Sequence, residues 1–272
     1  MKYKAYILAA DPNWIEASVL SYYDYVDEII VSYDSDSKGW SGQPIPVEEC
    51  LRRLRTIDKN HKMRFIGDSY YRPSHSPMDN DTYQRQCAID EIGNTADWIL
   101  ELDTDEVLPN AKAFIERLAE VPKDKIIVYW PMRVFFQRTK AGRFLEVTTF
   151  LRRQYSEFPG PVATRPGVQL DCARRASSAP YWRFDIRHKN ADAVIPKDDA
   201  ILHFSWVRSE DDILRKIRGW GHSKDFNVET YYKKVWKDAP RYWPLLYNFH
   251  PVSPKTWQAL WPVSLNKRFS GP

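Results

Sequence analysis

Cysteine is scarce in this 272-residue chain, and its distribution excludes two kinds of site. Cys50, Cys87 and Cys172 are too widely spaced for a zinc cluster, and an odd number does not suit a disulfide framework. Sparse, unpaired cysteines are typical of reduced thiols in the cytosol. We therefore expect a cytoplasmic protein that uses neither zinc clusters nor disulfides.

Long hydrophobic runs are also missing. No run approaches the roughly 18 apolar residues of a membrane span. The apolar part of residues 1–11 is too short for a signal peptide. The sequence predicts a soluble protein without a transmembrane segment, and it leaves peripheral contact with a membrane open.

Glycine is limited to 10 residues, and no glycine-rich phosphate loop is present. A Gly-x-Gly-x-x-Gly fingerprint does not follow the first expected strand, residues 3–10, so dinucleotide binding is not indicated. The absence of a Walker loop argues against ATP hydrolysis. A nucleotidyltransferase would normally carry a glycine-rich loop after this strand as well, and Ala-Ala-Asp-Pro at residues 9–12 is not one.

Aromatic residues and unevenly placed charges are what the chain has in abundance. It contains 11 Trp, 16 Tyr and 12 Phe, whose rings fill cores and also stack on sugars and bases. Residues 1–151 hold 19 basic and 24 acidic side chains, a net charge of −5, whereas residues 152–272 hold 21 and 12, a net charge of +9. The second part suits an anionic partner such as a diphosphate, nucleic acid or lipid, or it is simply a solvated basic surface.

Strand and helix patterns alternate through the first part of the chain. Strands are expected at residues 3–10, 28–34, 62–68 and 98–102, and helices at 14–26, 47–58, 81–93 and 111–120. This alternation predicts a parallel α/β sheet. After residue 122 the pattern changes, with strands expected at 125–136, 143–153 and 200–207, helices at 209–221 and 228–238, and a proline-rich tail. We expect a mixed, mainly parallel sheet flanked by helices, followed by a helical and irregular C-terminal extension.

Three expected strands end in acidic residues, Asp34, Asp68 and Asp103. Right-handed crossovers would bring these ends to one edge of the sheet, where ligands of open α/β sheets bind. Asp103 and Asp105 place two carboxylates one residue apart at a strand end, which suits Mg²⁺ or Mn²⁺ carrying phosphate oxygens. The alternative is that these acids cap the helix that follows.

The segment Asp-Trp-Ile-Leu-Glu-Leu-Asp-Thr-Asp-Glu-Val-Leu, residues 97–108, with the strands and helices before it, resembles the family-2 glycosyltransferases of the GT-A (Rossmann-like) fold. Leu-His-Phe-Ser-Trp-Val-Arg-Ser at residues 202–209, with Gly-His-Ser further on, is similar to a C-terminal segment of the same group. The resemblance implies that Asp103 and Asp105 hold Mn²⁺ or Mg²⁺ on the diphosphate of a donor, and that His203 completes the metal shell. From the residues alone a core histidine is the favoured interpretation of His203, and His222 is a helix cap or a phosphate contact.

The resemblance also implies contacts to a nucleotide-sugar donor, with UDP as the expected nucleotide. Ala10 and Asp11 would meet the base or ribose, Asp34 a ribose hydroxyl or base edge, and Asp68 a uracil N–H. Arg85 would meet the diphosphate or the neighbouring carboxylates, as suits a planar guanidinium. The alternative for each polar residue is a turn cap or a surface salt bridge.

Inversion at the sugar, which the resemblance implies, needs a general base near the acceptor hydroxyl. The acidic signature usual in the family is missing between residues 140 and 200. Asp171 and Asp185 are the preferred candidates because they lie among arginine and aromatic residues, and Glu146 and Asp198 are alternatives.

A basic and aromatic segment in the second part is expected to border the site of an anionic acceptor, or else to be a solvated loop. Its residues are Arg174, Arg175, Tyr181, Trp182, Arg183, Phe184, Arg187 and Lys189.

Residues 1–122 are therefore expected to form the donor half of a single GT-A domain, and residues 123–272 the acceptor half with its extension. The expected activity is a metal-dependent transfer of a sugar to a hydroxyl of a surface glycan or lipid-linked sugar. One alternative is the same chemistry on a hydroxymethylpyrimidine of phage DNA, with a flipped base stacked on Trp182, Trp206 or Trp220. Another is a module that binds sugars or nucleotides without catalysis.

Overall fold

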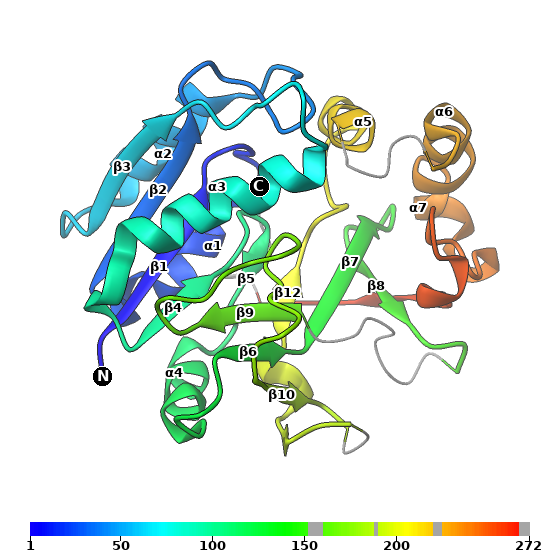
Figure 1. The fold of residues 1–272 in the computed structure, drawn as a ribbon. Coiled ribbons are helices and arrows are strands. Elements are labelled where there is room, and N and C mark those ends of the chain that lie inside the picture. Colours follow the sequence, from blue (N-terminus) through cyan, green and yellow to red (C-terminus); the bar gives the residue numbers. More distant parts are fainter. Residues whose placement is uncertain (152–159, 188–189, 220–224, 267–272) are drawn as a thin grey trace. The chain divides into compact units, whose positions relative to one another are not determined.

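The computed structural model describes residues 1–151, 160–187, 190–219 and 225–266, which form two compact units (Figure 1). The first unit comprises residues 1–131 and 159–201, and the second comprises residues 132–158 and 202–272. Neither unit is a continuous half of the chain. None of the helices in this described part combines the length and the apolar character that a membrane crossing requires.

The first unit is a mixed α/β structure built on one large sheet, which confirms the expected fold class at this level. The strand order is β11-β10-β6-β9-β4-β1-β2-β3, and β1 to β4 are mutually parallel. The strands are β1 (Tyr3–Leu8), β2 (Glu28–Asp34), β3 (Met63–Asp68), β4 (Trp98–Glu101), β6 (Ile127–Trp130), β9 (Gly160–Thr164), β10 (Tyr181–Asp185) and β11 (Ala193–Val194), with a short β5 (Glu106–Val107) after β4. The helices are α1 (Ile15–Tyr22), α2 (Val47–Ile57), α3 (Pro77–Ile92) and α4 (Ala111–Glu120), with 3₁₀ turns at Tyr23–Tyr25, Gly93–Thr95 and Lys197–Asp199.

Helix α3 begins earlier than the expected start at residue 81. The Ser76 hydroxyl accepts the backbone N–H of Asp79 at 3.1 Å, and the Asp79 carboxylate accepts the backbone N–H of Ser76 at 3.1 Å. This reciprocal capping box, with Pro77 in the first turn, starts the helix. The early start places residues 77–80 on the helix rather than in a loop.

Helix α3 packs on the sheet through an apolar cluster. Ala88, Ile89 and Ile92 of the helix belong to one buried group with Tyr6 of β1 and Ile99 of β4. Burying an isoleucine-sized side chain contributes about 1.5–3 kcal/mol. The helix is thereby fixed on the sheet, and with it Asp81 and Arg85, which lie on the same buried face.

The strand expected at residues 125–136 is wrong as a single element. It is split at Pro131 into β6 and β7 (Met132–Arg138), which belong to different units. Proline has no N–H to donate to a ladder, so a strand pair cannot run through it unchanged. The carbonyl of Pro131 instead accepts the N–H of Ile201 at 2.9 Å.

The second unit contains an antiparallel sheet and a set of short helices. Strand β8 (Phe144–Thr148) pairs with β7 and with β13 (Ala259–Val263), and β12 (Ile201–His203) comes next to β7 in the sheet order. The helices are α5 (Glu210–Gly219), α6 (Val228–Tyr231), which continues as a π-helical turn at Tyr232–Trp236, and α7 (Ala239–Tyr242). Short 3₁₀ turns lie at Trp243–Leu245 and Pro254–Thr256.

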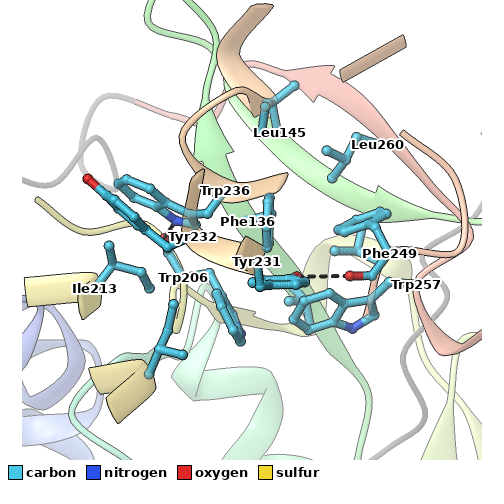
Figure 2. Packing of buried hydrophobic residues seen from close by; sticks show 14 residues of the cluster. Phe136, Leu145, Trp206, Ile213, Tyr231, Tyr232, Trp236, Phe249, Trp257 and Leu260 are labelled. Atoms are coloured by element: carbon cyan, nitrogen blue, oxygen red, sulfur yellow. Dashed lines mark hydrogen bonds between the residues drawn. The ribbon is translucent and has the colours of Figure 1, made fainter. Parts of the chain in front are cut away.

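Aromatic side chains fill the core of the second unit (Figure 2). Trp206 lies edge-on to Trp257, with ring centres 5.4 Å apart, and its carbonyl accepts the indole N–H of Trp236 at 2.9 Å. The Tyr231 hydroxyl donates to the carbonyl of Phe249 at 2.9 Å. Trp206 is only 5% exposed, so part of the aromatic excess of the sequence serves packing rather than ligand stacking.

Candidate functional site at the end of strand β4

The strand order of the first unit reverses beside β1. Strands β2 and β3 lie on one side of β1 and β4 lies on the other, all running in the same direction. Ligands of open α/β sheets bind outside the carboxyl ends of the strands at such a reversal. Ala10 and Asp11 follow the end of β1, and Asp103 and Asp105 follow the end of β4. The sequence candidates therefore flank the expected ligand crevice.

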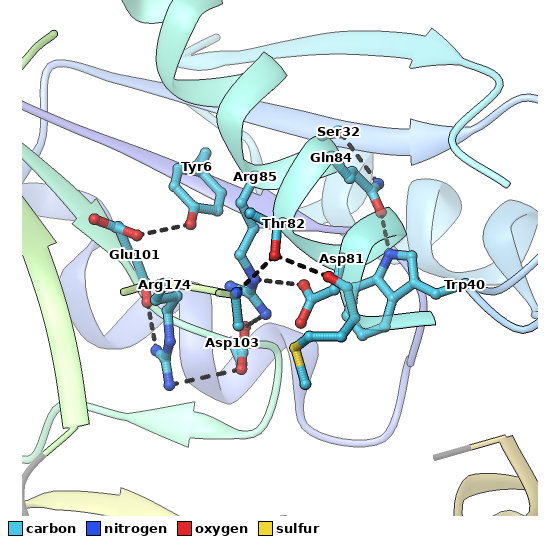
Figure 3. Close-up of polar contacts among 12 residues, drawn as sticks. Tyr6, Ser32, Trp40, Asp81, Thr82, Gln84, Arg85, Glu101, Asp103 and Arg174 are labelled. Atoms are coloured by element: carbon cyan, nitrogen blue, oxygen red, sulfur yellow. Dashed lines mark hydrogen bonds and ion pairs between the residues drawn. The ribbon is translucent and has the colours of Figure 1, made fainter. Parts of the chain in front are cut away.

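Asp103 is held by two arginines (Figure 3). The Arg85 Nη2 donates to its Oδ1 at 2.9 Å, and the Arg174 Nη2 lies 3.8 Å from its Oδ2. Burial raises the pKa of Asp103, but the two guanidinium groups outweigh it and hold the pKa below its usual range. The side chain remains 32% exposed, so an ionised carboxylate is accessible to solvent at neutral pH.

Arg85 links helix α3 to the end of β4. Its side chain is 4% exposed, and its Nε donates to the Asp81 carboxylate at 2.6 Å, one turn earlier on the helix. Burial raises the pKa of Asp81, although Arg85 acts in the opposite direction. Arg85 is therefore a fixed bridge between two carboxylates, and its expected contact to a diphosphate stays a prediction.

Arg174 reaches the same place from a distant loop. It donates to both carboxylate oxygens of Glu106, at 2.7 and 2.8 Å, and to the carbonyl of Glu101 at 2.6 Å. Glu106 is fully buried and also accepts the backbone N–H of Asp103 at 3.0 Å. The backbone N–H of Ala173 binds the Thr82 hydroxyl at 2.7 Å, which anchors this loop on α3. Arg174 thus fixes the turn that carries the acidic pair.

Glu101 and Tyr6 extend the polar group into the sheet. The Tyr6 hydroxyl donates to the Glu101 carboxylate at 2.9 Å, and both side chains are buried. Burial raises the pKa of Glu101 to about 7. Sequence reasoning missed these two residues, as well as Glu106 and Asp81. A glutamate inside the apolar run 98–102 was the available signal for Glu101.

The charges at the end of β4 suit a divalent cation. Asp81, Asp103 and Glu106 bind Arg85 or Arg174, and Asp105 lies close enough to Asp103 to oppose part of the lowering of the Asp103 pKa. Among the described residues no group of three or more His, Cys, Asp or Glu side chains is arranged to hold a metal. Magnesium-type ions commonly use one or two carboxylates and take the remaining ligands from phosphates and water. The Asp103–Asp105 pair fits such a partial shell.

His203 ends strand β12 and is half-buried. It belongs to the second unit, whereas the acidic pair belongs to the first, so its part in a metal shell stays a prediction. His222 and Lys189 lie outside the described residues.

The expected nucleotide contacts have structural partners of their own. The Asp34 carboxylate is buried and accepts four backbone N–H groups, from Asp36, Lys38, Tyr70 and Tyr71 at 2.9–3.3 Å. It therefore ties the loop after β2 to the loop after β3.

Two further expected contacts lie at strand ends with more exposure. Asp11 accepts the backbone and side-chain N–H groups of Asn13 at 3.0 and 2.8 Å, next to half-buried Ala10. Asp68 is exposed at the end of β3, and its carboxylate accepts the N–H of Ser69 at 2.7 Å. Both carboxylates are accessible at the carboxyl edge of the sheet.

Asp185 lies at the same edge of the sheet as Asp103. Strand β9 is antiparallel to both β4 and β6, and β10 is parallel to β6, so β10 and β4 run in the same direction. Asp185 is the last residue of β10, three strands from β4, or roughly 14 Å at the usual strand spacing. It is buried and faces Arg183 at 3.3 Å and Arg187 at 3.8 Å.

The other candidate bases are not at strand ends of this sheet. Asp171 is exposed in a loop, where it accepts the backbone N–H of Ser177 at 2.5 Å. Glu146 is fully buried in the second unit and binds Arg133 through two hydrogen bonds, at 2.9 and 3.0 Å. Asp198 lies in the 3₁₀ turn before β12.

The basic segment is only partly an open surface. Arg174 is bound inside the acidic group, and Arg183 and Arg187 face Asp185, whereas Arg175 is exposed. Three of its arginines therefore balance carboxylates of the first unit.

Comparisons with known proteins find a partial structural likeness. No family model matches the chain, and no curated protein sequence matches it. The chain is similar to the crystal structure of S. aureus TarS 1–349, with 13% identity and a TM-score of 0.32, over 52% of this chain and 36% of that one. It is also similar to the crystal structure of S. aureus TarS, with 14% identity and a TM-score of 0.29, over 52% of this chain and 22% of that one. The chain thus covers about a third or less of the length of these structures.

Proposed function

We propose that this chain is a metal-dependent glycosyltransferase that moves a sugar from a nucleotide-diphosphate sugar, with UDP as the preferred nucleotide, to an acceptor hydroxyl. The observation that carries the proposal is the position of Asp103-Thr-Asp105 beside the reversal of strand order between β1 and β4. This is where an open α/β sheet receives a ligand.

The donor would lie across the ends of β1 to β4. Ala10, Asp11 and Asp68 would meet its nucleoside at the ends of β1 and β3, whereas the buried Asp34 would act through the loops after β2 and β3 that it ties together. Arg85 keeps Asp103 ionised and oriented. Because the planar guanidinium of Arg85 bonds to two carboxylates at once, it fixes the orientation of these carboxylates and also balances their negative charge.

Mn²⁺ or Mg²⁺ would be held by Asp103 and Asp105, with His203 of the second unit as the proposed third ligand. When bound, such an ion offsets the negative charge that builds on the departing diphosphate. The spacing of the two carboxylates at the end of β4, with the side chain of Asp103 32% exposed, supports this assignment.

Asp185 is the preferred general base, with Asp171 as the alternative. A base must lie within hydrogen-bond reach of the hydroxyl that it deprotonates. Asp185 shares the carboxyl edge of the sheet with Asp103, at roughly 14 Å by the usual strand spacing. Removal of the acceptor proton by Asp185 would allow the hydroxyl to attack the sugar directly, which inverts the anomeric configuration.

A glycan or a lipid-linked sugar is the proposed acceptor. A flipped DNA base would need open aromatic platforms, but Trp206 is packed in the core of the second unit. Trp182 is half-buried, and Trp220 lies outside the described residues.

Release of nucleoside diphosphate from a panel of nucleotide sugars, with and without Mn²⁺, tests the proposal. Asp105→Ala should lower turnover by about a hundredfold or more, because the variant loses the metal that offsets negative charge in the transition state. Asp124→Ala is the matched control, since Asp124 is a surface acid of the same unit with a 75% exposed side chain. If Asp105→Ala still turns over the donor in the presence of a chelator, the metal assignment is wrong. If the unaltered chain neither binds nor cleaves any nucleotide sugar, the proposed function is wrong.

A further inference from the structure

A set of large apolar side chains is exposed on the second unit. Leu151 and Leu245 are 75% and 74% exposed, which is unusual for leucine, and four aromatic side chains are 41–50% exposed. We name this set the apolar edge. It consists of Phe150, Leu151, Tyr242, Leu245, Tyr247 and Trp261.

Ring contacts join segments that are distant in sequence into this edge. Phe150, just after β8, stacks on Tyr247 with ring centres 5.5 Å apart. Trp261 of β13 lies edge-on to Trp243 at 5.9 Å, and Trp243 packs in turn against the aromatic core. The backbone N–H of Phe150 also binds the Gln258 side chain at 3.1 Å. The exposed rings are therefore braced by the core and do not belong to a loose tail.

Basic side chains outnumber acidic ones beside the apolar edge, although the exposed Asp238 lies one helical turn before Tyr242. Residues 239–266 contain no Asp or Glu, and their basic side chains, Arg241 and Lys255, are both exposed. The Arg241 guanidinium lies 4.9 Å from the centre of the Tyr242 ring. Such a surface attracts anions at its rim while presenting hydrocarbon at its centre.

We propose that the apolar edge binds the surface of an anionic lipid bilayer. Tryptophan and tyrosine favour the boundary between headgroups and acyl chains, and protruding leucines add apolar area that enters it. Arg241 and Lys255 complement anionic headgroups. The proposal does not depend on the transferase activity. Binding to a membrane would, however, bring the enzyme to a lipid-linked acceptor.

Other partners fit this surface less well. A sugar site orients hydroxyl groups through several polar side chains, and residues 239–266 supply amides but no carboxylate for this. Nucleic acid would require more phosphate contacts than two basic side chains supply. Exposed leucines beside interfacial aromatics are instead what a bilayer recognises.

Co-sedimentation of the full chain with vesicles tests the proposal, using phosphatidylcholine alone and phosphatidylcholine with about 30% phosphatidylglycerol. The chain should bind the anionic vesicles more tightly. Leu245→Glu combined with Trp261→Ser should weaken that binding by about tenfold or more. Arg241→Glu with Lys255→Glu should remove the preference for anionic lipid. The matched control is Leu20→Glu, which changes a 53% exposed leucine of α1 in the first unit and should leave binding intact.

Circular dichroism and thermal unfolding establish that each variant is folded. Absence of vesicle binding by the unaltered chain would overturn the proposal, and so would equal binding by the Leu245/Trp261 variant. If that variant instead loses self-association in sedimentation while vesicle binding is unaffected, the edge is a contact between copies of the chain and the proposal is again overturned.

Discussion

Arg174 donates hydrogen bonds to both carboxylate oxygens of Glu106, a residue 68 positions earlier in the chain. The Glu106 side chain has no exposure, and the Arg174 side chain has 13%. This pair connects the loop before β10 to the turn that carries Asp103 and Asp105, so the stability of the fold and the shape of the candidate site depend on the same contact.

Arg174→Ala should lower the free energy of unfolding by about 3–5 kcal/mol, because it leaves a buried carboxylate without its partner. Urea denaturation measures this difference. The neighbouring Arg175 is exposed, and Arg175→Ala should change stability by about 0.5 kcal/mol or less. Similar small effects from both substitutions would show that the Arg174–Glu106 pair is not what fixes the turn.

The alternation of strands and helices through residue 120 could be predicted from sequence because each element has a local pattern. The run 98–102 is apolar and β-prone, and it forms β4; the residues after it are acidic, and they lie at the carboxyl edge of the sheet. Asp103 and Arg85 were likewise found from position on a strand end and a helix, and the structure brings them together.

Contacts between distant segments left no local signal. Arg174 was assigned to a basic acceptor segment because its neighbours are basic, and nothing near it indicates Glu106. The break at Pro131 was missed because the flanking residues are uniformly β-prone. The early start of α3 was missed because Ser, Pro and Asp are common in loops. Ser76, Pro77 and Asp79 indicate the start of a helix only through their spacing.

Glu101 should make stability fall as pH rises. Burial raises its pKa from 4.5 to about 7, so between these values the native state keeps a proton that the unfolded state releases. The free energy of unfolding should therefore decrease by about 3 kcal/mol across this window and then level off. Glu101→Gln keeps an acceptor for Tyr6 but does not titrate, and it should remove this contribution. Urea denaturation of both proteins from pH 5 to 8 makes the comparison; parallel curves would contradict the assignment.

His203→Ala should weaken Mn²⁺ binding in the presence of a nucleoside diphosphate by about 10- to 100-fold, if the imidazole is a metal ligand. Its effect on the thermal transition should be modest. Calorimetric titration with Mn²⁺ gives the affinity, and His75→Ala, at an exposed histidine of the first unit, serves as the control. A large stability loss with unchanged metal affinity would instead identify His203 as a packing residue.

Arg85→Met tests whether Arg85 acts through Asp103. Methionine has a similar length but carries no charge, so the Asp103 carboxylate loses the nearer of its two guanidinium partners. The pKa of Asp103 should then rise toward its ordinary range. Because the proposed reaction needs Asp103 ionised, activity should be lost at a higher pH on the acid side of the profile. Donor cleavage measured from pH 4 to 8 records this shift.

Arg64→Met provides the comparison, because Arg64 also joins two acids, Glu28 and Glu91, but its side chain is 44% exposed at the surface. It should leave the acid side of the profile in place. A second comparison separates positioning from direct phosphate binding: if Arg85 only orients Asp103, raising the Mn²⁺ concentration at neutral pH should restore most of the activity of Arg85→Met. If Arg85 instead binds the diphosphate, the Michaelis constant for the donor stays high at saturating Mn²⁺, since no metal replaces a missing guanidinium fork.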